Sequence, residues 1–109
     1  HLYVKLGVKL LPGTDVAAGV STLHREIKLF AKNGLGNLKA LQTATIDAAV
    51  NLKIDKQYGS IESGKIANIV IYDANPIDQL KTIEKPIMVI KSGKPLNVNV
   101  LRKHGNFIN

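Results

Sequence analysis

The chain has 109 residues, 45% of them hydrophobic and 5% aromatic, which suits one small domain or the end of a larger one. It contains no cysteine, so disulfide bonds and thiolate metal ligands are excluded. The net charge of +7 raises the question of nucleic-acid binding, but the lysines are spread singly without interleaved aromatics, and we expect no nucleic-acid partner.

The first residues predict the end of a helix followed by a buried strand. Residues 1–6 are typical of the last helical turns, and Gly7 is the usual stop signal. Residues 8–11 are too apolar for a one-sided strand, which predicts a strand covered on both faces. This run ends in Gly13-Thr14-Asp15, where the glycine lets the backbone turn. Asp15 therefore occupies the place where (β/α) barrels carry catalytic groups, the C-terminal end of a strand.

The middle of the chain predicts helices. Ser21 or Thr22 can cap a helix whose apolar face repeats at helical spacing from Leu23 to Ala31, and Asn33-Gly34 ends it. Glu26 can cap this helix or pair with neighbouring lysines. A second pattern runs from Asn37, a plausible cap, to Leu52. Because Thr45 can cap a fresh turn, we expect two short helices in succession there.

From about residue 53 the pattern changes to strands and turns. Residues 69–72 and 87–90 predict strands buried on both faces, and Ser92-Gly93 predicts a two-residue hairpin turn. Residues 98–109 are polar and predict a tail or a final edge piece. This order of elements fits an α+β fold, or the end of an α/β barrel joined to a β module.

Four motifs occur in sequence: Gly13-Thr14-Asp15, Leu23-His24-Arg25-Glu26-Ile27, Ala40-Leu41-Gln42-Thr43-Ala44-Thr45 and the segment from Gly59 to Ile71. Together, over residues 7 to about 96, they resemble the C-terminal end of the amidohydrolase superfamily, the metal-dependent hydrolases, and most of all its imidazolonepropionase and prolidase-like branch. The resemblance implies an α/β fold class. Residues 1–52 are then the last strand and helices of a (β/α)8 barrel, residues 53–97 a small β-sandwich (composite) module, and residues 98–109 a tail.

The resemblance also gives Asp15 its role. Asp15 matches the family's aspartate at the end of barrel strand eight, which contacts the metal and takes the proton from the metal-bound water that attacks the scissile carbonyl. Asp15 is thus the predicted catalytic residue and metal ligand, with a divalent metal, zinc in our expectation, in the full-length parent. The family's usual aspartate after Ala67 is Asn68 here, a departure that could weaken a turn.

The family's other ligands come from earlier strands that this chain does not match. They are a His-x-His pair, a carboxylated lysine or a glutamate, and two further histidines; His1, His24 and His104 cannot replace them. We therefore expect the parent to hydrolyse a C–N bond of a small-molecule or dipeptide-like substrate, and this fragment alone to be inactive and free of cofactor.

One alternative stays open. The chain can instead be a non-enzymatic remnant that associates with itself or with the missing barrel portion, because its apolar faces need covering. No apolar stretch approaches the roughly 20 residues that span a bilayer, and the start does not resemble a signal peptide, so we expect a cytoplasmic chain without a membrane partner. The substrate, the number of metals and the oligomeric state are left open.

Overall fold

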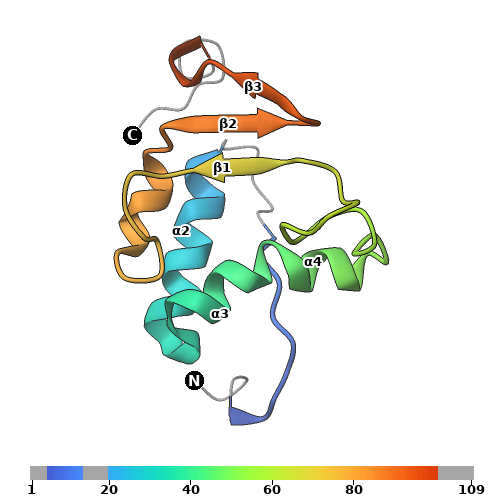
Figure 1. Cartoon of the computed structure of the whole chain (residues 1–109). Helices are drawn as coiled ribbons and strands as arrows, with labels where there is room; N and C mark the ends of the chain where they lie inside the picture. The colour runs from blue at the N-terminus through green and yellow to red at the C-terminus, as the bar shows by residue number, and fades with distance from the viewer. Residues whose placement is uncertain (1–4, 14–19, 101–109) are drawn as a thin grey trace.

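Helices precede strands in the computed structural model, which describes residues 5–13 and 20–100 of the chain. The helical part consists of α2 (Val20–Phe30), the π-helical turn η1 (Ala31–Leu35), α3 (Gly36–Thr43) and α4 (Ile46–Asn51). The strand part consists of β1 (Ile69–Ile71), β2 (Met88–Lys91) and β3 (Lys94–Leu96). The 3-10 helix η2 (Leu80–Glu84) comes between β1 and β2 in the chain but packs against α2, so it belongs to the helical region. Figure 1 shows the sheet on one side of the helices, with β1 nearest to them and β3 farthest away. None of the helices in these two ranges is long and apolar enough to cross a bilayer.

Helix α2 buries the apolar face that its sequence predicts. Ile27 is only 4% exposed, and Phe30 packs against the same core. Asn33-Gly34 leaves the helical conformation, with a φ of 122° at the glycine, and this confirms the predicted end of the helix. The predicted cap is wrong, because the backbone is already helical at Val20 and Ser21-Thr22 lies inside the helix.

Helices α3 and α4 are the two short helices that the sequence predicts. Thr45 stands between them but does not cap α4, because its Oγ1 donates backward to the carbonyl of Leu41 at 3.0 Å. Asn37 lies inside α3 instead of capping it. Its Nδ2 donates to the carbonyl of Ile77 at 2.7 Å, which ties α3 to the segment that leads into η2.

The sheet is antiparallel in the order β1-β2-β3, with Ile69 opposite Ile90. Ser92-Gly93 forms the predicted two-residue turn between β2 and β3, and its φ values of 50° and 80° fit a type I′ hairpin. The Ser92 N–H donates to Oδ1 of Asn68 at 2.8 Å. The amide oxygen of Asn68 therefore makes this turn contact although the family pattern has aspartate there.

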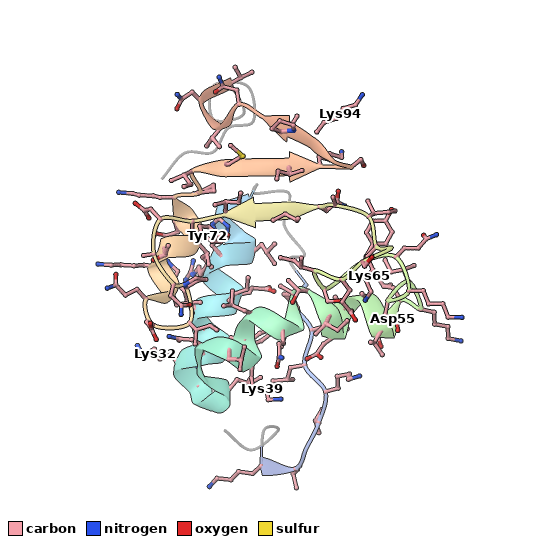
Figure 2. All side chains as sticks on the ribbon, viewed as in Figure 1. Lys32, Lys39, Asp55, Lys65, Tyr72 and Lys94 are labelled. Atoms are coloured by element: carbon pink, nitrogen blue, oxygen red, sulfur yellow. The ribbon has the colours of Figure 1, made fainter. Side chains whose placement is uncertain are left out.

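The core lies among the helices. Ile27 of α2, Ala40 of α3 and Ile83 of η2 are 4%, 0% and 2% exposed and pack together. Tyr72, which directly follows β1, packs against the same cluster, and Figure 2 shows it at the junction between the sheet and the helices. The phenol ring thus attaches the sheet to the helical core.

The predicted strand over residues 8–11 is absent, since residues 8–13 have no regular secondary structure. A barrel strand needs neighbouring strands to accept its backbone hydrogen bonds. The sheet formed by the described part of the chain contains β1, β2 and β3 only, and residues 7–10 instead lie along a shallow hollow beside Gly34, Leu35 and α3.

The prediction that both strands are buried on both faces is also wrong. Val70 is 45% exposed, and on the opposite face the paired residues Ile71 and Met88 are 37% and 41% exposed. Three short strands and the helices beside β1 do not provide the second layer that such strands need.

The polar end of the chain is not entirely structureless. Residues 98–100 form a helical turn, and Oδ1 of Asn97 accepts the N–H of Asn99 at 2.9 Å and that of Val100 at 3.3 Å. Asn97 is therefore the cap of this turn, which the sequence analysis did not predict.

Candidate functional site

The predicted catalytic residue, Asp15, lies outside the described residues, and its role as base and metal ligand stays a prediction. The structure does describe the chain that leads to it, up to Gly13. It also describes α2, the first helix after it. These two elements are the part of the candidate site whose geometry is known.

A glutamate on α2 contacts the backbone just before the predicted site. Oε2 of Glu26 accepts a hydrogen bond from the N–H of Gly13 at 2.7 Å. Bonds from backbone N–H groups to carboxylates are short and stronger than neutral ones. Glu26 was expected to cap its helix or to pair with neighbouring lysines, and the ion pairs among the described residues do not include it. In the sequence, the position of Glu26 in the Leu23–Ile27 motif was the only signal that this residue could have a role near the predicted site.

Gly13 itself does not need the freedom of glycine in this conformation. Its φ lies outside the left-handed region, and a Cβ added there would meet no atom within 4 Å. Whether the backbone turns after Gly13 lies outside the described residues. What Gly13 supplies to the described contact is its backbone N–H.

An ion pair also connects helix α2 to η2. Lys28 Nζ contacts Oε1 of Glu84 on η2, and this hydrogen bond lowers the pKa of the Glu84 carboxyl. His24, one turn before Lys28, is half-buried beside the same pair. Burial lowers the pKa of His24 below its ordinary value, although the charge of Glu84 opposes this effect. His24 is thus a residue of the α2–η2 contact.

The described residues do not form a metal site. No group of three or more His, Cys, Asp or Glu side chains comes together within residues 5–13 and 20–100. A divalent ion needs about three or four protein ligands in fixed geometry. The metal implied by the resemblance therefore does not fit this part of the chain, and we derive no chemical step through it.

An apolar hollow of about 480 Å³ lies between α4, the loop after it and β1. Its lining carries hydroxyl and amide groups but no histidine, aspartate or glutamate: Leu41, Ala44, Thr45, Ala48, Ala49, Leu52, Ile54, Tyr58, Gly59, Ser60, Ile61, Ile66, Asn68, Ile69, Val70 and Tyr72. Such a lining offers tyrosine hydroxyls but no carboxylate or imidazole that could act as a base near neutral pH. The hollow is therefore a weak candidate for a catalytic site.

Lysines are dispersed over the structure. Figure 2 shows Lys32, Lys39 and Lys94 extending from η1, α3 and β3, three separate elements. A nucleic-acid interface gathers such charges on one face or along one helix. The distribution of the labelled lysines does not support that function.

Comparison with known proteins identifies similar chains. The sequence model of the amidohydrolase family matches residues 2–96. Adenine deaminase of Desulforamulus reducens is 41% identical over 61 residues, which cover 56% of this chain and 9% of the deaminase. The 5-methylthioadenosine/S-adenosylhomocysteine deaminase of Teredinibacter turnerae is 32% identical over 92 residues, which cover 74% of this chain and 21% of that protein.

A solved structure is similar over more of the chain. A Xaa-Pro dipeptidase with bound methionine in the active site superposes with a TM-score of 0.78 and 35% sequence identity. The match covers 86% of this chain and 23% of the dipeptidase. The chain thus spans less than a quarter of the length of each of these three relatives.

Proposed function

Because this chain belongs to the amidohydrolase family, we propose that it forms the C-terminal part of an enzyme that hydrolyses a carbon–nitrogen bond in an amide, a peptide or a cyclic amide. The observation that carries the proposal is the family match over residues 2–96. The likeness to the Xaa-Pro dipeptidase adds to it, because at 35% identity more than the fold is shared. A cytoplasmic location is part of the same proposal.

The architecture of the whole enzyme is part of the proposal. Residues 1–52 contribute the last strand and helices of a (β/α)8 barrel, residues 53–97 a composite β module, and residues 98–109 a tail. The exposed apolar side chains of β1 and β2 support this division, because further strands or a second layer would cover them. Residues 8–11 become a strand only when barrel neighbours lie beside them.

Asp15 is the proposed general base. A carboxylate within hydrogen-bond reach of the attacking water orients it and takes its proton. The divalent metal belongs to the complete protein, since the described residues of this chain do not gather its ligands. The proposed substrate is dipeptide-like, because the dipeptidase match covers more of this chain than either deaminase match.

The test is a substrate panel on the complete polypeptide that contains this chain. Release of the C-terminal amino acid from Xaa-Pro and N-acyl amino-acid substrates is measured beside ammonia release from adenine and related purines. We expect peptide hydrolysis, and Asp15→Asn should lower kcat by about 10²- to 10⁴-fold, the usual contribution of a general base. Asp73→Asn, which alters an exposed carboxylate after β1, is the matched control and should retain activity.

Two outcomes contradict the proposal. If Asp15→Asn leaves kcat unchanged, Asp15 is not the base, and if purines alone are turned over, the dipeptide-like substrate is wrong. Hydrolysis by the pure 109-residue chain, abolished by Asp15→Asn, contradicts the expectation that this fragment is inactive.

A non-enzymatic association module is the second candidate, and one observation favours it. Large apolar side chains are unusually exposed, among them Ile61 at 79%, Leu52 at 65% and Ile87 at 58%. Native mass spectrometry separates the two functions. A metal-free species of 11.8 kDa, or a simple multiple of it, favours association, whereas a longer chain or a second fragment retained with divalent ions favours the enzyme.

A further inference from the structure

We propose that Asn33 is a site of spontaneous covalent modification, at which attack by the backbone nitrogen of Gly34 converts the asparagine to aspartate and isoaspartate. Asn33 is the only asparagine in the sequence that a glycine follows. The glycine matters because no side chain beside the attacking nitrogen hinders its approach to the Asn33 amide carbon. The inference is independent of the proposed function, since it needs neither Asp15 nor a metal.

The structure places both residues in an exposed bend. Asn33 and Gly34 lie in η1, which connects α2 to α3 (Figure 1), and both are open to solvent. Their backbone leaves the helical conformation, with φ −96° and ψ 22° at Asn33 and φ 122° and ψ −14° at Gly34. The attack requires rotation about ψ of Asn33, which a regular helix resists. Gly34 and Gly36, with φ values of 122° and 77°, leave the backbone freer to rotate here.

One hydrogen bond of the Asn33 side chain opposes the reaction. Its Nδ2 donates to the carbonyl of Leu29, one turn back on α2, at 2.7 Å. This contact holds the nitrogen that leaves, but it does not cover the carbon that is attacked. Because the bond is exposed, water can replace the Leu29 carbonyl with little net change in free energy. The bond therefore slows the modification without preventing it.

The reaction uses only the chain and water. The Gly34 nitrogen loses its proton and forms a bond to Cγ of Asn33, the bond from Cγ to Nδ2 breaks, and ammonia leaves with that proton. Water then opens the resulting cyclic imide. Opening at Cγ gives aspartate, whereas opening at the main-chain carbonyl of residue 33 gives isoaspartate, in which the chain runs through the former side chain. No oxidant or reductant takes part.

The products weaken the connection between α2 and α3. Either product removes the donor to the Leu29 carbonyl and places a negative charge at the C-terminal end of α2, where the helix dipole disfavours it. Isoaspartate also lengthens the backbone of the bend. Gly34 and Leu35 line the hollow along which residues 7–10 lie, so the altered bend adjoins the segment that leads to Gly13.

Peptide mass spectrometry of the 109-residue chain, incubated in mildly alkaline buffer, tests the inference. Conversion replaces –NH₂ by –OH and increases the mass of the peptide. Asn37 is the matched control within the same chain, because its Nδ2 also donates to a backbone carbonyl, that of Ile77, at 2.7 Å, but it lies inside α3 and precedes leucine. We expect Asn33 to convert at least about tenfold faster than Asn37.

Two variants separate the route of the reaction from its effect on stability. Asn33→Gln keeps an amide but would have to close a larger ring, so position 33 should stay unmodified. Asn33→Asp carries the charge of the product, and its thermal midpoint should lie about 2–6 °C below that of wild type. Because Asn33 is exposed, neither variant opens a cavity in the core.

Each part of the proposal has a result that overturns it. Equal conversion of Asn33 and Asn37, or none at either position, shows that the bend is not a modification site. Aspartate without isoaspartate means that water attacks the side chain directly and that the Gly34 nitrogen takes no part. If Asn33→Asp unfolds at the wild-type temperature, the modification does not weaken the connection between α2 and α3. Hydrolytic activity of the complete polypeptide bears on none of these results.

Discussion

The helical region and the sheet differ in how completely each buries its own apolar side chains. In the helices, Ile27, Ala40 and Ile83 are almost fully buried against one another. In the sheet, Val70 and Met88, on opposite faces, are 45% and 41% exposed. The helical region thus carries a small core of its own, whereas the sheet has strand-forming residues without enough neighbours to cover them.

The sheet exposes apolar side chains that the described residues do not cover. Sheets of three short strands gain independent stability only when a face is covered. Tyr72 supplies one attachment to the helical core, and the apolar hollow between β1 and α4 marks where the two regions do not pack fully. A complete amidohydrolase-like enzyme, as proposed, would cover the sheet with further chain.

Truncating one isoleucine in each region tests the difference in burial between them. Ile83→Ala on η2 should lower the free energy of unfolding by about 3 kcal/mol, because it opens a cavity in the core. Ile87→Ala, its matched control just before β2, should cost less than about 1 kcal/mol, since Ile87 is 58% exposed. Urea denaturation of the 109-residue chain measures both. If the two variants lose equal free energy of unfolding, the helical core does not contribute more to stability than the sheet.

A smaller effect is expected at the segment that joins the two regions. Gly59 has a φ of 101°, and an added Cβ would lie 2.7 Å from Cβ of Ala49 and 3.0 Å from Cα of Ile46. Gly59→Ala should therefore lower the free energy of unfolding by about 2 kcal/mol through strain and overpacking. Gly64 has a φ of 91° but open space around it, so Gly64→Ala should cost about 1 kcal/mol through strain alone. Similar losses in the two variants would mean that the Gly59 loop does not pack closely on α4.

Local signals in the sequence predicted the local structure well. Asn33-Gly34 ended a helix and Ser92-Gly93 formed a hairpin, because in both cases a few adjacent residues determine the backbone conformation. Capping was predicted less well. Thr45 has a good capping side chain, but its hydroxyl found a competing acceptor one turn back, at the Leu41 carbonyl.

Contacts between residues far apart in the chain could not be predicted from the local sequence pattern. Residues 8–11 have the composition of a buried strand, yet a strand forms only beside a partner, and none is present in the described part of the chain. The hydrogen bond between Gly13 and Glu26 links two motifs that the sequence shows as separate. The sequence indicated Asp15 through the family motif, whereas the contact of Glu26 with the Gly13 backbone became visible only in three dimensions.

The smallest predicted effect is a pH dependence that arises in the helical region. Burial holds the pKa of His24 below its ordinary value of 6.5, so the unfolded chain takes up this proton first as the pH falls. The free energy of unfolding should therefore begin to fall as the pH drops through about 6.5. Lys28 lowers the pKa of Glu84 below its ordinary value of 4.5, so a further loss should follow below about pH 4.5.

Urea denaturation between pH 7.5 and pH 3.5 separates the two losses, because His24→Gln should remove the first and Glu84→Gln the second. Both slopes should be shallow, since the side chains are partly exposed to solvent. If the loss near pH 6 survives His24→Gln, another group titrates there and the α2–η2 contact is not its source. If stability instead rises as the pH falls through 6.5, His24 gains more from the charge of Glu84 than it loses by burial.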